Sequence, residues 1–170
     1  SIRGELSANA ALQQGLNQTS GAVKVATAGA TAISNLTSDI QGKLVELSNP
    51  ANTAEQQGIL QNDLDALLGQ AQGFVDNSTF NGTNLLESGA GDLNTLQNGE
   101  GEVLTVSGQG SVADSLAALA AADFSDPASV LENEFTAFQS ALNNSLGELG
   151  ASGRRITAQN DQLQGIADAT

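Results

Sequence analysis

The sequence predicts a mainly α-helical fold, in which long heptad-patterned helices pack antiparallel as a coiled-coil-like rod or bundle. Apolar residues recur every seven positions near both ends of the 170-residue chain, as they do in packed amphipathic helices. The only aromatic residues are five Phe, so the core must be aliphatic, which suits close-packed helices. Gly, Asn and Thr concentrate in the middle, which predicts a small β-hairpin region between the second helix and the later ones. We expect one domain over residues 1–170.

A first helix is predicted over residues 1–48. No proline interrupts this segment before Pro50, and at 1.5 Å per residue the helix would be roughly 70 Å long. Gly15, Gly21, Gly29 and Gly42 each cost about 1 kcal/mol relative to Ala, so tertiary packing must hold it together. One seam of the seven-residue repeat is Ile2, Asn9, Leu16, Val23, Ala30, Thr37 and Leu44. Its partner seam is Leu12, Thr19, Ala26, Ile33, Ile40 and Leu47.

A second helix is predicted over residues 53–76. Pro50 disfavours helical backbone at Asn49, and Thr53 with Gln56 has the spacing of a capping box. Apolar residues then recur in threes and fours until the helix ends near Asp76. They are Leu60, Leu64, Leu67, Leu68, Ala71, Phe74 and Val75.

The stretch "DNSTFNGTNLLE" (Asp76–Glu87) has the length and the acidic ends of a helix-flanked calcium loop. Such a loop needs an oxygen ligand at its fifth place and glycine at its sixth, where this chain has Phe80 and Asn81. Asn81-Gly82 is instead a strong hairpin-turn signal, because both residues tolerate positive φ. We therefore interpret the stretch as a helix exit that runs into a turn.

The β-hairpin region is predicted over residues 80–110. "EVLTVSG" (102–108) has the alternation and β-branching of a strand, "TNLLES" (83–88) is a weaker strand candidate, and a further turn lies near Asn98. One or two small hairpins are expected, placed at the end of the rod far from the chain ends. An Ala-rich helix then follows over residues 111–123, capped by Ser111.

A long last helix is predicted over residues 126–168. Asp126 is placed as its N-cap, and Pro127 occupies the first helical position, where a missing N–H costs nothing. Antiparallel pairing with the first helix would bring both chain ends together at one end of a rod. The apolar seam is Phe135, Leu142, Leu149, Ile156 and Leu163, with Leu131, Phe138, Gln159 and Ile166 alongside.

The composition excludes several classes of function. The chain has no Cys and no His, so disulfides, the usual zinc sites and histidine acid–base catalysis are excluded. Its net charge is −14, and fifteen of its nineteen acids lie between Lys43 and Arg154, where no basic residue occurs. Nucleic acid and anionic membranes both require a basic footprint, so neither is an expected partner. No apolar run approaches the length of a membrane span.

We expect no catalytic, cofactor-binding or metal-binding residues, and therefore no enzyme. A glycosidase needs two carboxyl groups about 5–10 Å apart that face one cleft. Helical residues two positions apart point about 200° from each other, so close acids on these helices do not converge. The close pairs are Asp63 with Asp65, Glu100 with Glu102, and Glu132 with Glu134.

Arg154 and Arg155 are adjacent, which raises the possibility of a phosphate or carboxylate site. Because neighbouring helical residues diverge, we expect one to pair with an acid on another helix while the other faces water. An arginine here that bridges subunits of an assembly is the alternative. Phe135 and Phe138 are expected in the core rather than in a ligand pocket.

Four segments of the sequence resemble bacterial flagellin, specifically its rod-like helical core. "STFNGTNLLE" (78–87) is similar to the segment Thr-x-Phe-Asn-Gly-x-x-Leu-Leu that follows the family's second helix. "LTVSGQG" (104–110) resembles its strand Leu-x-x-Gln-x-Gly in altered form, and "VELSN" (45–49) resembles its Arg-Glu-Leu-Ala segment. "LGASGRRI" (149–156) is similar to Leu-Gly-Ala-x-x-Asn-Arg-Leu, with Arg154 in place of the asparagine and Ile156 in place of the last leucine.

The resemblance implies a structural subunit of the bacterial flagellar filament, which serves motility and assembles through terminal segments absent from this chain. It also implies an extracellular location at a flagellum or cell surface, reached without a cleaved signal peptide. The implied partners are other flagellin subunits, hook-associated and cap proteins, and an export chaperone.

The sequence departs from the family in three places. Val45 stands where flagellins carry an arginine of the surface recognised by the vertebrate innate immune receptor. The large variable outer domains are nearly absent between Gly110 and Asp126. The terminal segments that line the filament's inner core are missing, so we expect residues 1–170 not to polymerise alone.

A second hypothesis is a flagellin-like protein of the cell surface that acts as an adhesin or polysaccharide-binding receptor. The Asn- and Gly-rich, acid-bearing region from Asn77 to Glu102 is where such a site is expected. The absence of Trp and Tyr counts against sugar stacking. The charge of −14 counts against anionic polysaccharides, unless divalent cations bridge them.

Overall fold

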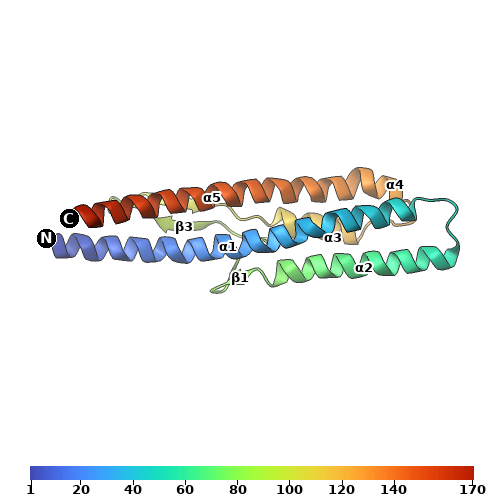
Figure 1. Cartoon of the computed structure of the whole chain (residues 1–170), viewed down its shortest axis with the longest axis horizontal. Helices are drawn as coiled ribbons and strands as arrows, with labels where there is room; N and C mark the ends of the chain where they lie inside the picture. Colours follow the sequence, from blue (N-terminus) through green and yellow to red (C-terminus); the bar gives the residue numbers. More distant parts are fainter.

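The computed structural model describes all residues from Ser1 to Thr170 and forms an elongated rod (Figure 1). Two long helices, α1 (Ile2–Leu47) and α5 (Thr136–Ala169), lie antiparallel along it, so that both chain ends meet at one end of the rod. The fold class predicted from the sequence, a mainly helical antiparallel rod with a small β-hairpin region, is confirmed.

The α1–α5 seam follows the seven-residue spacing. Its fully buried aliphatic residues come alternately from both helices and interdigitate along the rod. They include Leu16, Ala26, Ala30, Ile33, Ile40, Leu44, Leu142, Leu149 and Ile156. The prediction fails at the two positions nearest the chain ends, because Ile2 and Ile166 are 60% and 51% exposed. No other element covers them there (Figure 1).

Helix α2 (Ala54–Asp76) packs along α1 near the far end of the rod. Thr53 and Gln56 form the predicted capping box: the Thr53 hydroxyl accepts from the Gln56 N–H at 3.1 Å, and the Gln56 side chain accepts from the Thr53 N–H at 2.8 Å. An ion pair of 3.5 Å from Lys43 to Asp63 joins the two helices.

The stretch after α2 folds as a tight hairpin, β1 (Thr79–Phe80) with β2 (Thr83–Asn84). Asn81 and Gly82 form its turn with φ values of 49° and 77°, a positive pair that Asn and Gly adopt at little cost. The interpretation as a helix exit into a turn is therefore confirmed. The weaker strand candidate at 83–88 supplies only the two residues of β2.

A second antiparallel hairpin pairs β3 (Leu93–Leu96) with β4 (Val103–Val106). The sequence placed this region at the far end of the rod, which is wrong. The hairpin lies against α1 and α5 towards the chain ends (Figure 1), and the Gln159 side-chain amide donates to the Gln97 carbonyl at 2.5 Å. The reason is apolar burial: Leu104 and Val106 are 5% and 0% exposed, and at the far end they would face water.

Two helical details also differ from the predictions. Helix α3 (Ser111–Ala120) is not capped by Ser111, which is its first residue; Gly110 occupies the N-cap without a side-chain bond. The last helix runs without a break but is not α-helical throughout, because α4 (Pro127–Val130) continues through the π-helical turn η1 (Leu131–Phe135) into α5. Asp126 caps α4 as expected and accepts from the Ser129 N–H at 3.3 Å.

The core is one continuous aliphatic cluster to which all the helices contribute. Phe135 and Phe138 are 2% and 0% exposed within it, as predicted for core residues. None of the helices has both the length and the apolarity needed to span a bilayer.

Candidate assembly surface

The end of the rod that carries both chain ends is held in register by a buried amide. Asn9, 7% exposed, donates from Nδ2 to the Leu163 carbonyl at 2.8 Å. A buried amide in an aliphatic seam fixes the register because a slip would leave its donor unpaired. Leu6 is 39% exposed beside the two exposed isoleucines of this end, so the paired helices present apolar side chains at the end of the rod.

A second buried amide, Gln109, ties the hairpin region to α5. Its Oε1 accepts from the Ser145 hydroxyl at 2.7 Å, and its Nε2 donates to the Glu148 carboxylate at 2.6 Å. Its backbone N–H donates to the Leu85 carbonyl at 2.7 Å. Gln109 is 5% exposed and Ser145 is fully buried, so this one residue joins α5, through its side chain, to the segment at Leu85, through its backbone.

A third amide, Asn84, closes the exit of α2. It donates to the Val75 carbonyl at 2.7 Å and accepts from the Leu86 N–H at 2.9 Å. This fixes the first hairpin against the helix end and turns Leu85 and Leu86, which are 1% and 0% exposed, into the core. The sequence interpretation missed both Asn84 and Gln109; Asn84 follows the turn signal at 81–82, and Gln109 stands between two glycines, which were the available clues.

The prediction that Arg154 or Arg155 pairs with an acid on another helix is wrong. No carboxylate lies within ion-pair distance of either arginine, and both are exposed. Arg155 donates instead to the Thr105 carbonyl at 3.0 Å and to the Ser152 hydroxyl at 3.2 Å, so it fastens strand β4 to α5. The backbone carbonyl replaces the expected acid because the hairpin, rather than a helix, lies on this side of α5.

The acid pairs singled out in the sequence lie in three separate places. Asp63 faces Lys43 across the α1–α2 contact while Asp65 is exposed to solvent. The second pair, Glu100 and Glu102, lies at the exposed turn of the β3–β4 hairpin, and the third belongs to η1. No three Asp or Glu side chains come close enough to hold a metal ion.

The region from Asn77 to Glu102 borders one hollow of about 510 Å³ between α1 and the β3–β4 turn. Ala8, Ala11 and Gly15 form its helical wall, and Asn94 and Asn98 are among its hairpin residues. Small side chains on the helix make this space.

Exposed apolar side chains also lie on elements other than the two terminal helix ends. Leu96 and Val103 are 52% and 49% exposed on the β3–β4 hairpin. Val45 and Ile59 are 53% and 55% exposed at the α1–α2 end of the rod. Apolar side chains are therefore exposed at both ends of the molecule.

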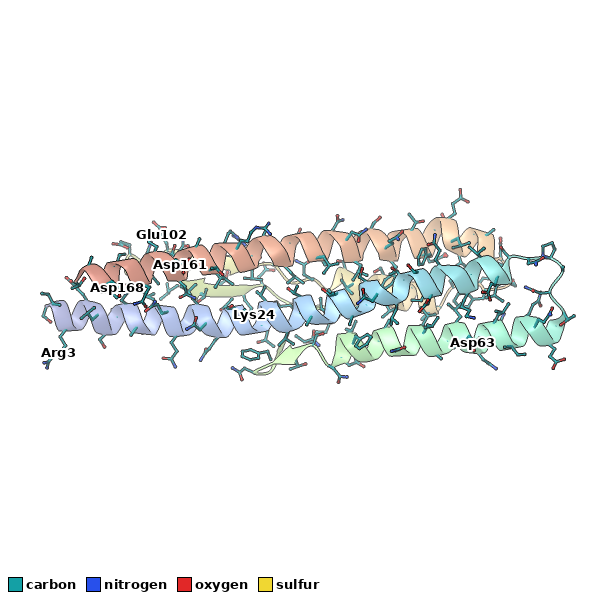
Figure 2. All side chains as sticks on the ribbon, viewed as in Figure 1. Arg3, Lys24, Asp63, Glu102, Asp161 and Asp168 are labelled. Carbon is teal, nitrogen blue, oxygen red and sulfur yellow. The ribbon has the colours of Figure 1, made fainter.

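Two further hollows line the α1–α5 groove, with volumes of about 630 and 460 Å³. They share Val23, Lys24, Gly150 and Gly153 and so form one continuous groove. Figure 2 shows Lys24 on α1 and Asp161 on α5. The surface that this arrangement offers is a long rod with shallow grooves, suited to contacts with other extended molecules.

Among solved structures, the fold of this chain is similar to that of a flagellin. The crystal structure of Bacillus cereus flagellin matches 90% of this chain and 88% of that chain with a TM-score of 0.68, at 17% sequence identity. No family model and no curated protein sequence matches the chain. The likeness is one of fold, covers nearly the whole rod, and includes both long helices. The chain has a flagellin-like fold.

Proposed function

We propose that this chain is a structural, non-enzymatic subunit of a bacterial flagellar filament, which works in motility outside the cell. One observation carries the proposal: the antiparallel rod of α1 and α5, which brings both chain ends to one end. Segments that continue α1 and α5 from there would run side by side. Such paired extensions can pack around a common axis in a polymer.

The rod supplies the other requirements of a filament subunit. Different apolar residues are exposed at its two ends: Ile2, Leu6 and Ile166 at one, and Val45 and Ile59 at the other. Contacts between unlike surfaces generate open helical polymers when the rotation does not close. A close-packed aliphatic seam along the rod makes each subunit stiff.

The proposed partners are other copies of the chain within the filament, together with hook-associated and cap proteins at its ends. An export chaperone would hold the chain before its secretion. These partners follow from the filament role and are tested with it.

Sedimentation with electron microscopy tests the proposal. The complete natural chain is compared with residues 1–170 at equal concentration. We expect long regular filaments from the complete chain only, because residues 1–170 provide the rod without the paired extensions. If the complete chain stays monomeric when filament seeds are supplied, the filament proposal is wrong.

The second candidate is a cell-surface adhesin or polysaccharide receptor, favoured by the hollow between α1 and the β3–β4 turn. Its amide side chains, Asn94 and Asn98, could hydrogen-bond sugar hydroxyl groups. Glycan-array binding with and without calcium distinguishes the two functions. Binding that is lost in an Asn98→Ala variant, combined with no filament formation, would favour the receptor.

A further inference from the structure

The α1–α5 groove bears cations that have no acid partner. Lys24 and Arg154 line the same hollow and are exposed, and neither has a carboxylate within 4.0 Å. They are two of only five cations in a chain of net charge −14. Asp161 is the one acid among the lining residues, so the groove is a locally basic strip on an acidic molecule.

The floor of this groove is lined by small residues. Gly150 and Gly153 stand on α5 opposite Thr27 and Ala28 of α1, and small residues allow a partner backbone to approach closely. Along α1 the lining runs from Ser20 to Asn35, about 22 Å at 1.5 Å per residue. This length corresponds to about four turns of a helix laid along the groove.

Helix α2 has the complementary surface. Its buried residues, among them Leu64, Leu68 and Val75, face the rod, and a second face is exposed to solvent. That face carries Glu55, Gly58, Asn62, Asp65, Gly69 and Asp76, all exposed. α2 has four acids and no cation, and of these only Asp63 takes part in an ion pair.

The glycines of this face have no function within the subunit. A Cβ added at Gly58 or Gly69 would meet nothing within 4 Å, although each glycine costs a helix about 1 kcal/mol relative to Ala. By contrast, a Cβ at Gly21 or Gly29 of α1 would collide with Phe80 or Ser78. Glycine at the open positions leaves room for the close approach of another backbone.

We propose that the acidic outer face of α2 in one copy packs into the α1–α5 groove of a second copy. Lys24 and Arg154 would face Asp65 and Asp76, and Gly58 and Gly69 would lie against the groove floor. The 23-residue α2, about 35 Å long, is long enough to fill the groove. The contact joins unlike surfaces, so it propagates instead of closing a dimer. This inference rests on the proposed filament function and names one of its contacts.

Site-directed cross-linking tests the contact, because the chain has no native cysteine. Asn62→Cys is combined with Thr31→Cys or with Thr157→Cys, at the two ends of the groove, in filaments of the complete chain. Under mild oxidation, one of the two pairs should give a covalent ladder of subunits. The matched control, Asn62→Cys with Asn94→Cys on the hairpin, should give none.

Two other results would each contradict one claim: the groove contact or the filament function. Normal filaments that give no ladder with either groove pair, or an equal ladder with the control pair, overturn the contact and leave the filament function standing. Failure of the unmodified complete chain to form filaments overturns the filament function itself. The two failures are therefore distinguishable.

Charge exchange provides the second test. Lys24→Glu with Arg154→Glu should raise the critical concentration for assembly about tenfold, since two ion pairs become repulsive. Adding Asp65→Lys and Asp76→Lys to the same chain should restore the wild-type value. Monomer melting followed by circular dichroism checks that every variant is folded. Unchanged assembly in the first variant, or a lack of restoration in the second when both are folded, contradicts the proposal.

Discussion

Replacing Gly29 by alanine should destabilise the protein, against the usual effect of this substitution in a helix. Alanine gains about 1 kcal/mol of helix propensity over glycine. At Gly29, however, the new Cβ would collide with the Ser78 hydroxyl and lie 3.2 Å from both Ser78 Cβ and Leu86 Cδ1. Ser78 is 3% exposed, so it has little room to move away.

The Ser78 hydroxyl is also engaged, since it donates to the Phe74 carbonyl at 2.6 Å. Rotating it away from a Cβ at Gly29 would break that hydrogen bond, at a cost of about 1 kcal/mol. Overpacking adds roughly 1–3 kcal/mol. After the propensity gain, the net loss is about 1–3 kcal/mol, which lowers the melting temperature by roughly 2–12 °C for a domain of this size.

The assay is urea unfolding followed by circular dichroism at 222 nm on residues 1–170. Gly58→Ala is the matched control, because its Cβ would meet nothing and should stabilise the chain by about 1 kcal/mol. The two variants should therefore shift the unfolding midpoint in opposite directions. Equal stabilisation by both would refute the close packing of α1 against the α2 exit.

Three further predictions concern single side chains. Gln109→Leu should cost about 1–3 kcal/mol in urea unfolding, because the buried Ser145 hydroxyl loses its partner; a value near zero would contradict its role. Thr53→Ala should cost about 1 kcal/mol in the same assay by removing the α2 cap, and an unchanged midpoint would show that the cap contributes nothing. Hydrogen bonds from the Ser125 hydroxyl and backbone N–H hold the pKa of Asp123 below its usual value of 3.8, so the stability they give is present above pH 3.8 and is lost as the pH falls through the lowered pKa. Ser125→Ala should raise that pKa towards its usual value in a carboxyl NMR titration, whereas an unchanged pKa would contradict this cause.

Local signals in the sequence predicted local structure well. The capping box at Thr53 and the turn at Asn81-Gly82 depend on residues no more than three positions apart, so both can be predicted from the sequence. The heptad seam likewise predicted the pairing of α1 with α5, because burial repeats with the helix period.

Features that depend on distant residues were not predictable in this way. The β3–β4 hairpin lies near the chain ends because Leu104 and Val106 find apolar cover there, which only the folded rod reveals. Gln109 gains its partners across 36 and 39 positions, and Arg155 meets a carbonyl 50 positions away. The charge of Arg155 predicted an acid partner, whereas in the structure its guanidinium donates to the backbone carbonyl of Thr105.

The most direct test of the filament function is immunogold electron microscopy of filaments sheared from the source cells, with an antibody against residues 1–170. We predict regular labelling along the whole filament and the chain as a major filament protein by mass spectrometry. Labelling confined to the cell envelope, with unlabelled filaments, would contradict the role of this chain as a filament subunit.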